Sequence, residues 1–228
     1  MARQARLFIP QCPLVLELQG MGGQPVFKTR QAFALFQDRM PQSAQEERIA
    51  VHAYCLAPTG AMLMVSAQQP DAVGRFVQNI NRHFSAFIRQ NQGRQVGSVW
   101  APRFKSTVVQ PNPHSLTASV FVETWATRTG QAHDLANYAW SSYPAHIGLV
   151  SAPWLTDLPL YWQLGNTPFE RQSRYKQLSE QGPSPREVAE LHDCLQKGWL
   201  WSDDAFYRQV AEHANRPARP RPKGRPMA

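Results

Sequence analysis

The stretch from Tyr54 to Val65 constrains the fold of this chain more than any other. An apolar run at 49–57 ends in the turn Pro58-Thr59-Gly60, and a second apolar run follows at 61–67. Proline fixes φ ahead of the turn, and glycine supplies the backbone freedom that a tight turn needs. We therefore predict two adjacent strands, with residues 59–62 at the lip of a sheet. Their side chains are poor ligands for a hard cation.

The rest of the first half supplies strands and helices in a recognisable order. Apolar density and helical spacing predict a strand at 13–19, a helix at 28–40, a long helix opening at Pro70, a strand at 104–109 and a helix at 115–127. With the two strands above, this order is typical of an α+β fold of the ferredoxin-like, split βαβ type. We expect residues 1–130 to form this domain, as an antiparallel sheet covered by helices on one face.

The composition changes after this domain. Residues 131–213 are predicted to form a packed loop, aromatic at 137–143, and a helical C-terminal extension with helices at 168–181, 185–197 and 203–213. Residues 214–228 form a basic, proline-rich tail that lacks the apolar side chains of a core, so we expect it to be disordered or extended.

The charge balance indicates the kind of partner. The 228 residues carry 24 Lys and Arg against 16 Asp and Glu, a net charge of +8, which favours a polyanion such as nucleic acid. No apolar window reaches the roughly 18 residues of a membrane span, and no signal-peptide core follows the N-terminus. A soluble, intracellular protein without membrane contact is expected. The three cysteines are far apart and indicate neither a disulfide framework nor a zinc ribbon.

Two groups of basic residues have more than one interpretation. Arg75, Arg82 and Arg89 follow one another at seven-residue intervals on the predicted long helix, either to track phosphates or as a solvated basic face. The tail contributes five positive charges and is either a phosphate-binding arm or a solubilising segment. Its charged residues are Arg216, Arg219, Arg221, Lys223 and Arg225.

Several segments along the chain, in order and spacing, carry a resemblance. They are residues 1–7, 24–27, 53–58, 103–106, 138–149, 198–199 and 219–226, including Arg103-Phe104-Lys105-Ser106 and Trp140-Ser141-Ser142-Tyr143. Together they resemble the transposases associated with repetitive extragenic palindromes, within the single-tyrosine, His-hydrophobic-His group of insertion-sequence transposases.

The resemblance implies a definite chemistry. In such enzymes two strand histidines and a polar helix side chain hold Mg²⁺ or Mn²⁺, and a tyrosine one helical turn earlier attacks the DNA phosphorus. Aligned on the strand turn, Gly60 and Met62 stand at the two histidine positions. Counting back from Trp140, Phe121 stands at the tyrosine and Trp125 at the third ligand. The resemblance therefore implies a degenerate site without catalytic residues or metal, and a protein that is not an enzyme.

The seven histidines contain no His-x-His or His-x₃-His pair that could replace these ligands. Candidate DNA-binding residues remain. They are Arg3, Arg6, Arg103, Lys105, Arg216, Arg219, Arg221, Lys223 and Arg225. The loop Gln19-Gly20-Met21, by contrast, departs from the Arg-Gly-Asn usual in the family.

These residues favour an inactive or domesticated transposase homologue that binds hairpin or single-stranded DNA. It is expected in the bacterial cytoplasm, and on the nucleoid when bound to DNA. A second hypothesis is a protein-interaction subunit, with Met62, Phe121 and Trp125 filling the former cleft as an apolar contact or as core. The third is an active single-strand DNA transposase.

Overall fold

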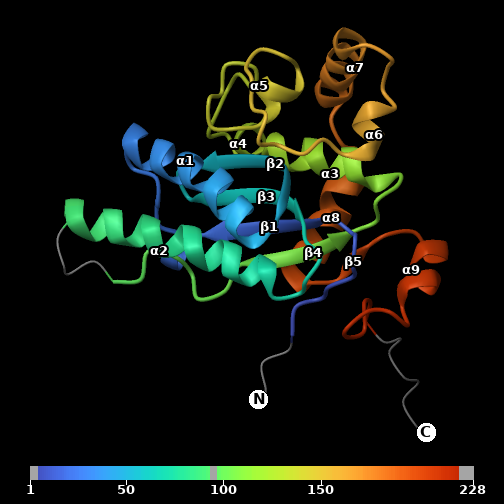
Figure 1. Cartoon of the computed structure of the whole chain (residues 1–228), viewed down its shortest axis with the longest axis horizontal. Helices are drawn as coiled ribbons and strands as arrows, with labels where there is room; N and C mark the ends of the chain where they lie inside the picture. Colours follow the sequence, from blue (N-terminus) through green and yellow to red (C-terminus); the bar gives the residue numbers. More distant parts are fainter. Residues whose placement is uncertain (1–4, 93–96, 221–228) are drawn as a thin grey trace, which may run out of the picture.

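A five-stranded sheet forms the centre of the molecule in the computed structural model, which describes residues 5–92 and 97–220 (Figure 1). The strands lie in the order β2-β3-β1-β4-β5. Their bounds are β1 Leu14–Gln19, β2 Ala50–Ala57, β3 Gly60–Ser66, β4 Lys105–Val109 and β5 Leu200–Trp201. The pairs β2–β3, β3–β1 and β1–β4 are antiparallel, which confirms the predicted α+β class and split βαβ order. The two-residue β5 was not predicted, and it pairs parallel with β4.

Gly60 is needed for a different reason than the turn suggested. It opens β3 opposite Ala57 of β2 and Gln19 of β1, and it is not among the residues with positive φ. A Cβ atom at this position would lie 2.0 Å from the backbone oxygen of Leu18. Glycine is therefore required by the close approach of β1 rather than by the turn.

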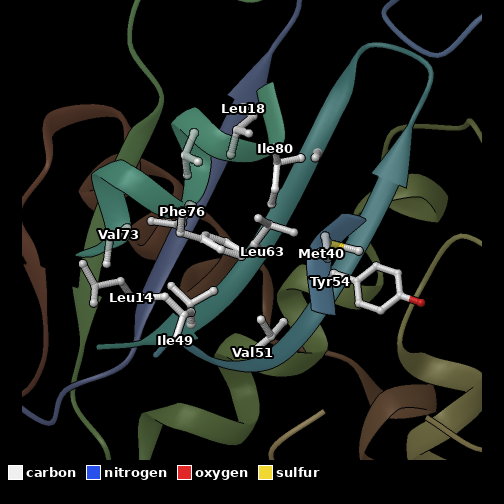
Figure 2. Close-up of a cluster of buried hydrophobic side chains, with 14 of the residues drawn as sticks. Leu14, Leu18, Met40, Ile49, Val51, Tyr54, Leu63, Val73, Phe76 and Ile80 are labelled. Atoms are coloured by element: carbon white, nitrogen blue, oxygen red, sulfur yellow. The ribbon is translucent and has the colours of Figure 1, made fainter. Parts of the chain in front are cut away.

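Helices cover both faces of the sheet, so the prediction of one covered face was wrong. α1 Arg30–Glu47 and α2 Ala72–Gln92 pack on one face, shown in close-up in Figure 2. α3 His114–Glu123, α4 Trp125–Arg128 and α8 Pro185–Lys197 pack on the other. The physical reason is visible in β1, where consecutive residues are buried and alternate side chains enter different clusters. Strands that are apolar on both sides need cover on both sides.

The first helix is longer than predicted. Thr29 caps α1 by accepting a hydrogen bond from the Ala32 amide, and the helix continues beyond Met40 through Pro41. Ser43 and Ala44 extend its buried face, so packing on the sheet outweighs the hydrogen bond that proline removes. The helix ends at Arg48, in the left-handed conformation with a φ of 54°.

The C-terminal extension contains the predicted helices and two short additional ones. α7 Pro168–Gln181 has the predicted bounds, as does α8, whereas α9 Asp204–Val210 is shorter. The additional helices are α5 Tyr143–His146 and α6 Pro159–Trp162. Outside this extension, a 3₁₀ turn, η1, covers Met21–Gly23 shortly after β1. Within the described residues, no helix combines the length and the apolarity needed to cross a membrane.

The beginning of the tail is packed, contrary to the expectation of a disordered or extended segment from residue 214. The Leu200 amide donates to the Ala218 carbonyl at 2.9 Å, and Ala218 is buried. Asn215 donates to the Arg6 carbonyl at 2.8 Å and accepts from the Phe8 amide at 3.0 Å. Residues 214–220 thereby join the N-terminal segment to the edge of the sheet.

Candidate nucleic-acid interface

Five cations surround one narrow pocket of about 230 Å³. The N-terminal segment contributes Arg6, the entry to β4 contributes Arg103 and Lys105, the end of α8 contributes Lys197, and the packed tail contributes Arg216. Among the described residues that line it, none is acidic. We call this site the narrow pocket.

Lys105, which lines the narrow pocket, pairs with a buried carboxylate. Glu17 lies opposite Lys105 in the β1–β4 register, and the ammonium is 3.6 Å from its carboxylate. Gln19 and Gln196 also donate to Glu17, at 2.6 and 3.2 Å. The carboxylate is therefore satisfied within the protein, while the Lys105 side chain remains one-third exposed at 33%.

The Arg216 guanidinium is partly buried at the narrow pocket. Its guanidinium donates to the Gly198 carbonyl and lies 5.3 Å from the centre of the Trp199 ring. Burial lowers the pKa of Arg216, and the charge of nearby Arg103 lowers it further. Its Nε atom is buried and has no hydrogen-bond partner. Crowded cations of this kind are stabilised by an anion placed between them.

The narrow pocket adjoins a wider groove of about 640 Å³ that lies between α2 and residues 97–104. Arg6 and Phe104 line both cavities, and the Arg6 guanidinium lies over the Phe104 ring at 3.6 Å from its centre. The stack thus marks the junction of the two cavities. The described lining of the wider groove also contains no acidic residue.

The structure brings four of the predicted DNA-binding residues together and separates one from them. Arg6, Arg103, Lys105 and Arg216 all line the narrow pocket. Arg219 instead pairs with Asp204, donates to the Ser202 carbonyl at 2.6 Å and lies over the Tyr207 ring. It fastens the tail to α9. The predicted residues Arg3, Arg221, Lys223 and Arg225 lie outside the described residues.

Lys197 was not among the predicted residues. It ends α8, one residue before Gly198, and pairs with Asp193 one turn earlier at 2.7 Å. A cation in the last turn of a helix normally complements the helix dipole, so its local sequence context indicates no ligand. Its position beside Arg103 and Arg216 in the narrow pocket is what makes it a candidate phosphate contact.

The four positions that the resemblance assigns to the metal ligands and the nucleophile lie in the interior of the protein. Gly60 and Met62 lie on β3, while Phe121 and Trp125 lie on α3 and α4. Met62, Phe121 and Trp125 belong to one apolar cluster and are 2%, 1% and 7% exposed. They offer no oxygen or nitrogen ligand, so the site does not fit Mg²⁺ or Mn²⁺.

The surroundings of these positions supply no replacement metal site. Across the part of the chain that the structure describes, no three His, Cys, Asp or Glu side chains are grouped to hold a metal ion. The three apolar side chains are core, and they present no surface for the protein contact considered in the second hypothesis.

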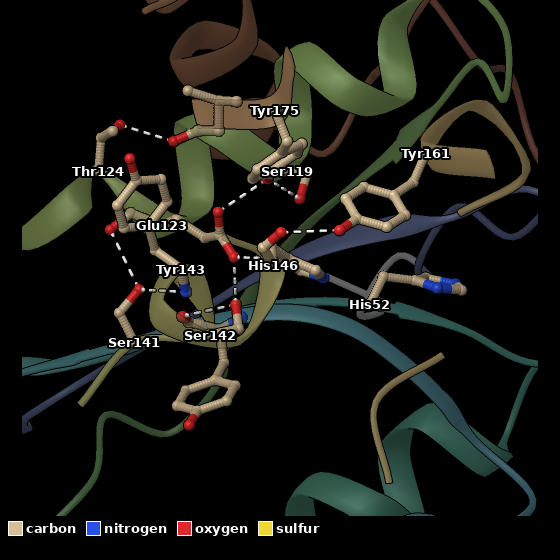
Figure 3. Close-up of polar contacts among 12 residues, drawn as sticks. His52, Ser119, Glu123, Thr124, Ser141, Ser142, Tyr143, His146, Tyr161 and Tyr175 are labelled. Carbon is tan, nitrogen blue, oxygen red and sulfur yellow. Dashed lines mark hydrogen bonds and ion pairs between the residues drawn. The ribbon is translucent and has the colours of Figure 1, made fainter. Parts of the chain in front are cut away.

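A buried polar network lies next to this core and was missed by the sequence reasoning (Figure 3). Glu123, fully buried near the end of α3, accepts from His146 at 2.6 Å, from Ser142 at 2.5 Å and from Tyr175 at 2.7 Å. These partners come from α5, the loop before it and α7. The available signal was a single carboxylate within the apolar helix predicted at 115–127.

The Glu123 network is structural. Burial alone lowers the pKa of His146, but the charge of Glu123 and its hydrogen bond outweigh burial and raise it above the ordinary value. Burial, followed by the Glu123 charge, raises the pKa of the Tyr175 hydroxyl well above its ordinary range. His52, nearby on β2, contacts the Thr156 carbonyl and Ser66 through its two ring nitrogens. It is a core histidine with both ring nitrogens satisfied.

Comparison with known proteins shows a likeness in fold. No protein-family model matches the chain, and no curated protein matches it in sequence. Among solved structures, its fold is similar to that of a REP-associated tyrosine transposase bound to a REP hairpin, with a TM-score of 0.54 and 12% sequence identity. The match covers 69% of this chain and 93% of that chain. At this identity the likeness concerns the fold alone: the chain shares its fold with a tyrosine transposase.

Proposed function

We propose that this protein binds DNA, as a hairpin or a single strand, and that it does not cleave it. The observation that carries the proposal is the narrow pocket, where five cations from four segments meet. Lys105 and Lys197 each pair with an acid outside the described lining, and the lining itself contains no acid. Phosphates of a nucleic acid offset the mutual repulsion of such a cluster. The structural neighbour is bound to a REP hairpin, which makes hairpin DNA the first probe to use.

The absence of cleavage is supported by the chemistry of the core positions. Phenylalanine at 121 has no oxygen to attack phosphorus, and a methionine thioether at 62 is a soft ligand unsuited to Mg²⁺ or Mn²⁺. At position 60 any side chain meets the backbone of β1. We infer that strand transfer has been lost while the phosphate-binding surface has been kept.

A titration of the purified chain with labelled DNA tests the proposal. We expect hairpin or single-stranded DNA to bind with a Kd below about 1 µM at ~50 mM salt, and binding to weaken steeply as salt is added. The variant Arg103→Gln/Lys105→Gln should bind every sequence more weakly. The slope of log K against log salt should fall in magnitude by about 1.4 on single strands, because each lost phosphate contact removes about 0.7.

The matched control is Lys176→Gln/Arg186→Gln. It removes the same charge from exposed positions whose partners are Glu180 and Glu190, outside both cavities. It should bind as the wild type does. Binding no tighter than micromolar, or binding that does not respond to salt, would overturn the proposal. Equal loss of affinity in both double variants would mean that Arg103 and Lys105 act only through the net charge of the protein.

A further inference from the structure

One face of α2 forms a wall of the wider groove. The helix residues that line it recur at spacings of three and four, from Gly74 and Gln78 through Asn81 and Ser85 to Arg89, with Arg82 beside them. Residues 97–104 form the facing wall. Spacings of three and four residues place side chains on the same side of a helix, so this wall is one helix face, polar and basic apart from Gly74 and Val77.

The three arginines spaced along α2 have different surroundings. Arg75 is neutralised: its guanidinium pairs with Glu47 at 2.6 Å and with Asp71 one turn earlier. Arg82 and Arg89 are exposed and line the wider groove, and the structure gives neither of them an ion pair or side-chain hydrogen bond with another described residue. A solvated basic face does not by itself explain why Arg75 is paired with acids while Arg82 and Arg89 are not paired with another described residue, because all three arginines lie on one helix.

Two further groups in the wider groove are unsatisfied. The Oδ1 atom of Asn81 and the Nε1 atom of Trp100 are buried and have no hydrogen-bond partner. Buried polar atoms are almost always paired in folded proteins, so Asn81 and Trp100 are two side chains of the groove lining whose hydrogen bonding is incomplete.

We propose that Arg82 and Arg89 bind phosphates of the same DNA strand that occupies the narrow pocket, so that one strand runs past the Arg6–Phe104 stack along α2. This inference rests on the proposed function and extends its site. Seven helical residues rise about 10.5 Å, which places the two guanidiniums at separate phosphates. Such contacts position the strand and carry no sequence information.

The competing explanation is local. Arg89 lies in the last turn of α2, where a cation complements the helix dipole, and Arg82 is then only a solvent-facing charge. That explanation predicts a small loss of stability in an Arg89 variant and no change in DNA affinity. The two explanations therefore differ in a binding measurement.

The test compares Arg82→Gln/Arg89→Gln with Arg75→Gln/Lys176→Gln, which removes the same charge through residues already paired with acids. Fluorescence anisotropy with a series of oligo-dT probes gives Kd at several salt concentrations. For long probes, the first variant should lower the salt slope by about 1.4, so its affinity deficit shrinks about sevenfold between 50 and 200 mM salt. Probes too short to reach α2 from the narrow pocket should bind this variant and the wild type with equal affinity.

The outcomes separate this inference from the proposed function. If Arg82→Gln/Arg89→Gln matches its control on all probes while Arg103→Gln/Lys105→Gln binds weakly, the α2 contacts are refuted and the narrow pocket stands. If wild type binds no DNA, both proposals fail. Thermal melting of each variant confirms folding, which substitutions of exposed side chains should leave intact.

Discussion

Glu123 joins three segments of the C-terminal half to α3 through one carboxylate. Its carboxylate is fully buried beside the apolar cluster, and it accepts hydrogen bonds from His146, Ser142 and Tyr175. Removing a carboxylate from water costs several kcal/mol, and only a complete set of donors offsets that cost. The network therefore fixes how α5 and α7 sit on α3.

We expect Glu123→Gln to lower the free energy of unfolding by about 3–5 kcal/mol, because it breaks a buried pair and leaves donors unsatisfied. Urea denaturation measures this change. Glu180→Gln is the control: the Glu180 side chain is 62% exposed and 3.9 Å from Lys176, so its effect should stay within about 0.5 kcal/mol.

The same variant should change how stability depends on pH. Because the folded-state pKa of His146 lies above its unfolded value, the pair contributes its full stability below the unfolded pKa and loses it as pH rises through the folded pKa. In Glu123→Gln the carboxylate that raises this pKa is gone, so that alkaline loss should disappear. An unchanged pH profile would show that Glu123 does not control the His146 proton.

Among the elements, those defined by local signals were predictable from the sequence. In α7 and α8, Thr167 with Glu170 and Ser184 with Glu187 form capping boxes, and Gly182 and Gly198 end the helices. Their bounds follow from neighbouring residues. β5 has two residues and exists because β4 lies beside it, so no local pattern marks it. The face on which α3 packs is likewise decided by the whole sheet.

The packed part of the tail depends on contacts with distant segments. Its hydrogen bonds include three that join Ala218 to Leu200, and Asn215 to Arg6 and Phe8. A chain that ends at residue 213 should therefore lose about 2–4 kcal/mol of unfolding free energy, at roughly 1 kcal/mol for each lost bond and some apolar burial.

A chain that ends at residue 220 is the matched comparison for this truncation. It keeps these hydrogen bonds, so its urea midpoint should equal that of the full chain. Equal midpoints for both truncated chains would mean that residues 214–220 add nothing to stability.

At the scale of the whole molecule, the sequence predicted the fold and the basic character but only part of the site. The resemblance identified Arg103 and Lys105 from their motif, and composition identified the basic tail. The narrow pocket exists because an N-terminal segment, a strand, a helix end and the tail meet at one place. Such a meeting depends on tertiary packing, which explains why Lys197 was missed and why the contacts of Arg219 with α9 were not predicted.

The whole arrangement also determines whether cleavage chemistry can be restored. Phe121→Tyr with Met62→His supplies a hydroxyl and one imidazole, but both positions lie in packed core, and position 60 has no room for a second imidazole beside Leu18. We expect neither this variant nor wild type to form a covalent adduct with labelled single-stranded DNA in Mn²⁺, judged on a denaturing gel. Adding Gly60→His should lower stability instead, because its Cβ forces β1 away from β3. An adduct in any of these chains would show that the core opens to admit metal and DNA, contrary to the packing of Met62, Phe121 and Trp125.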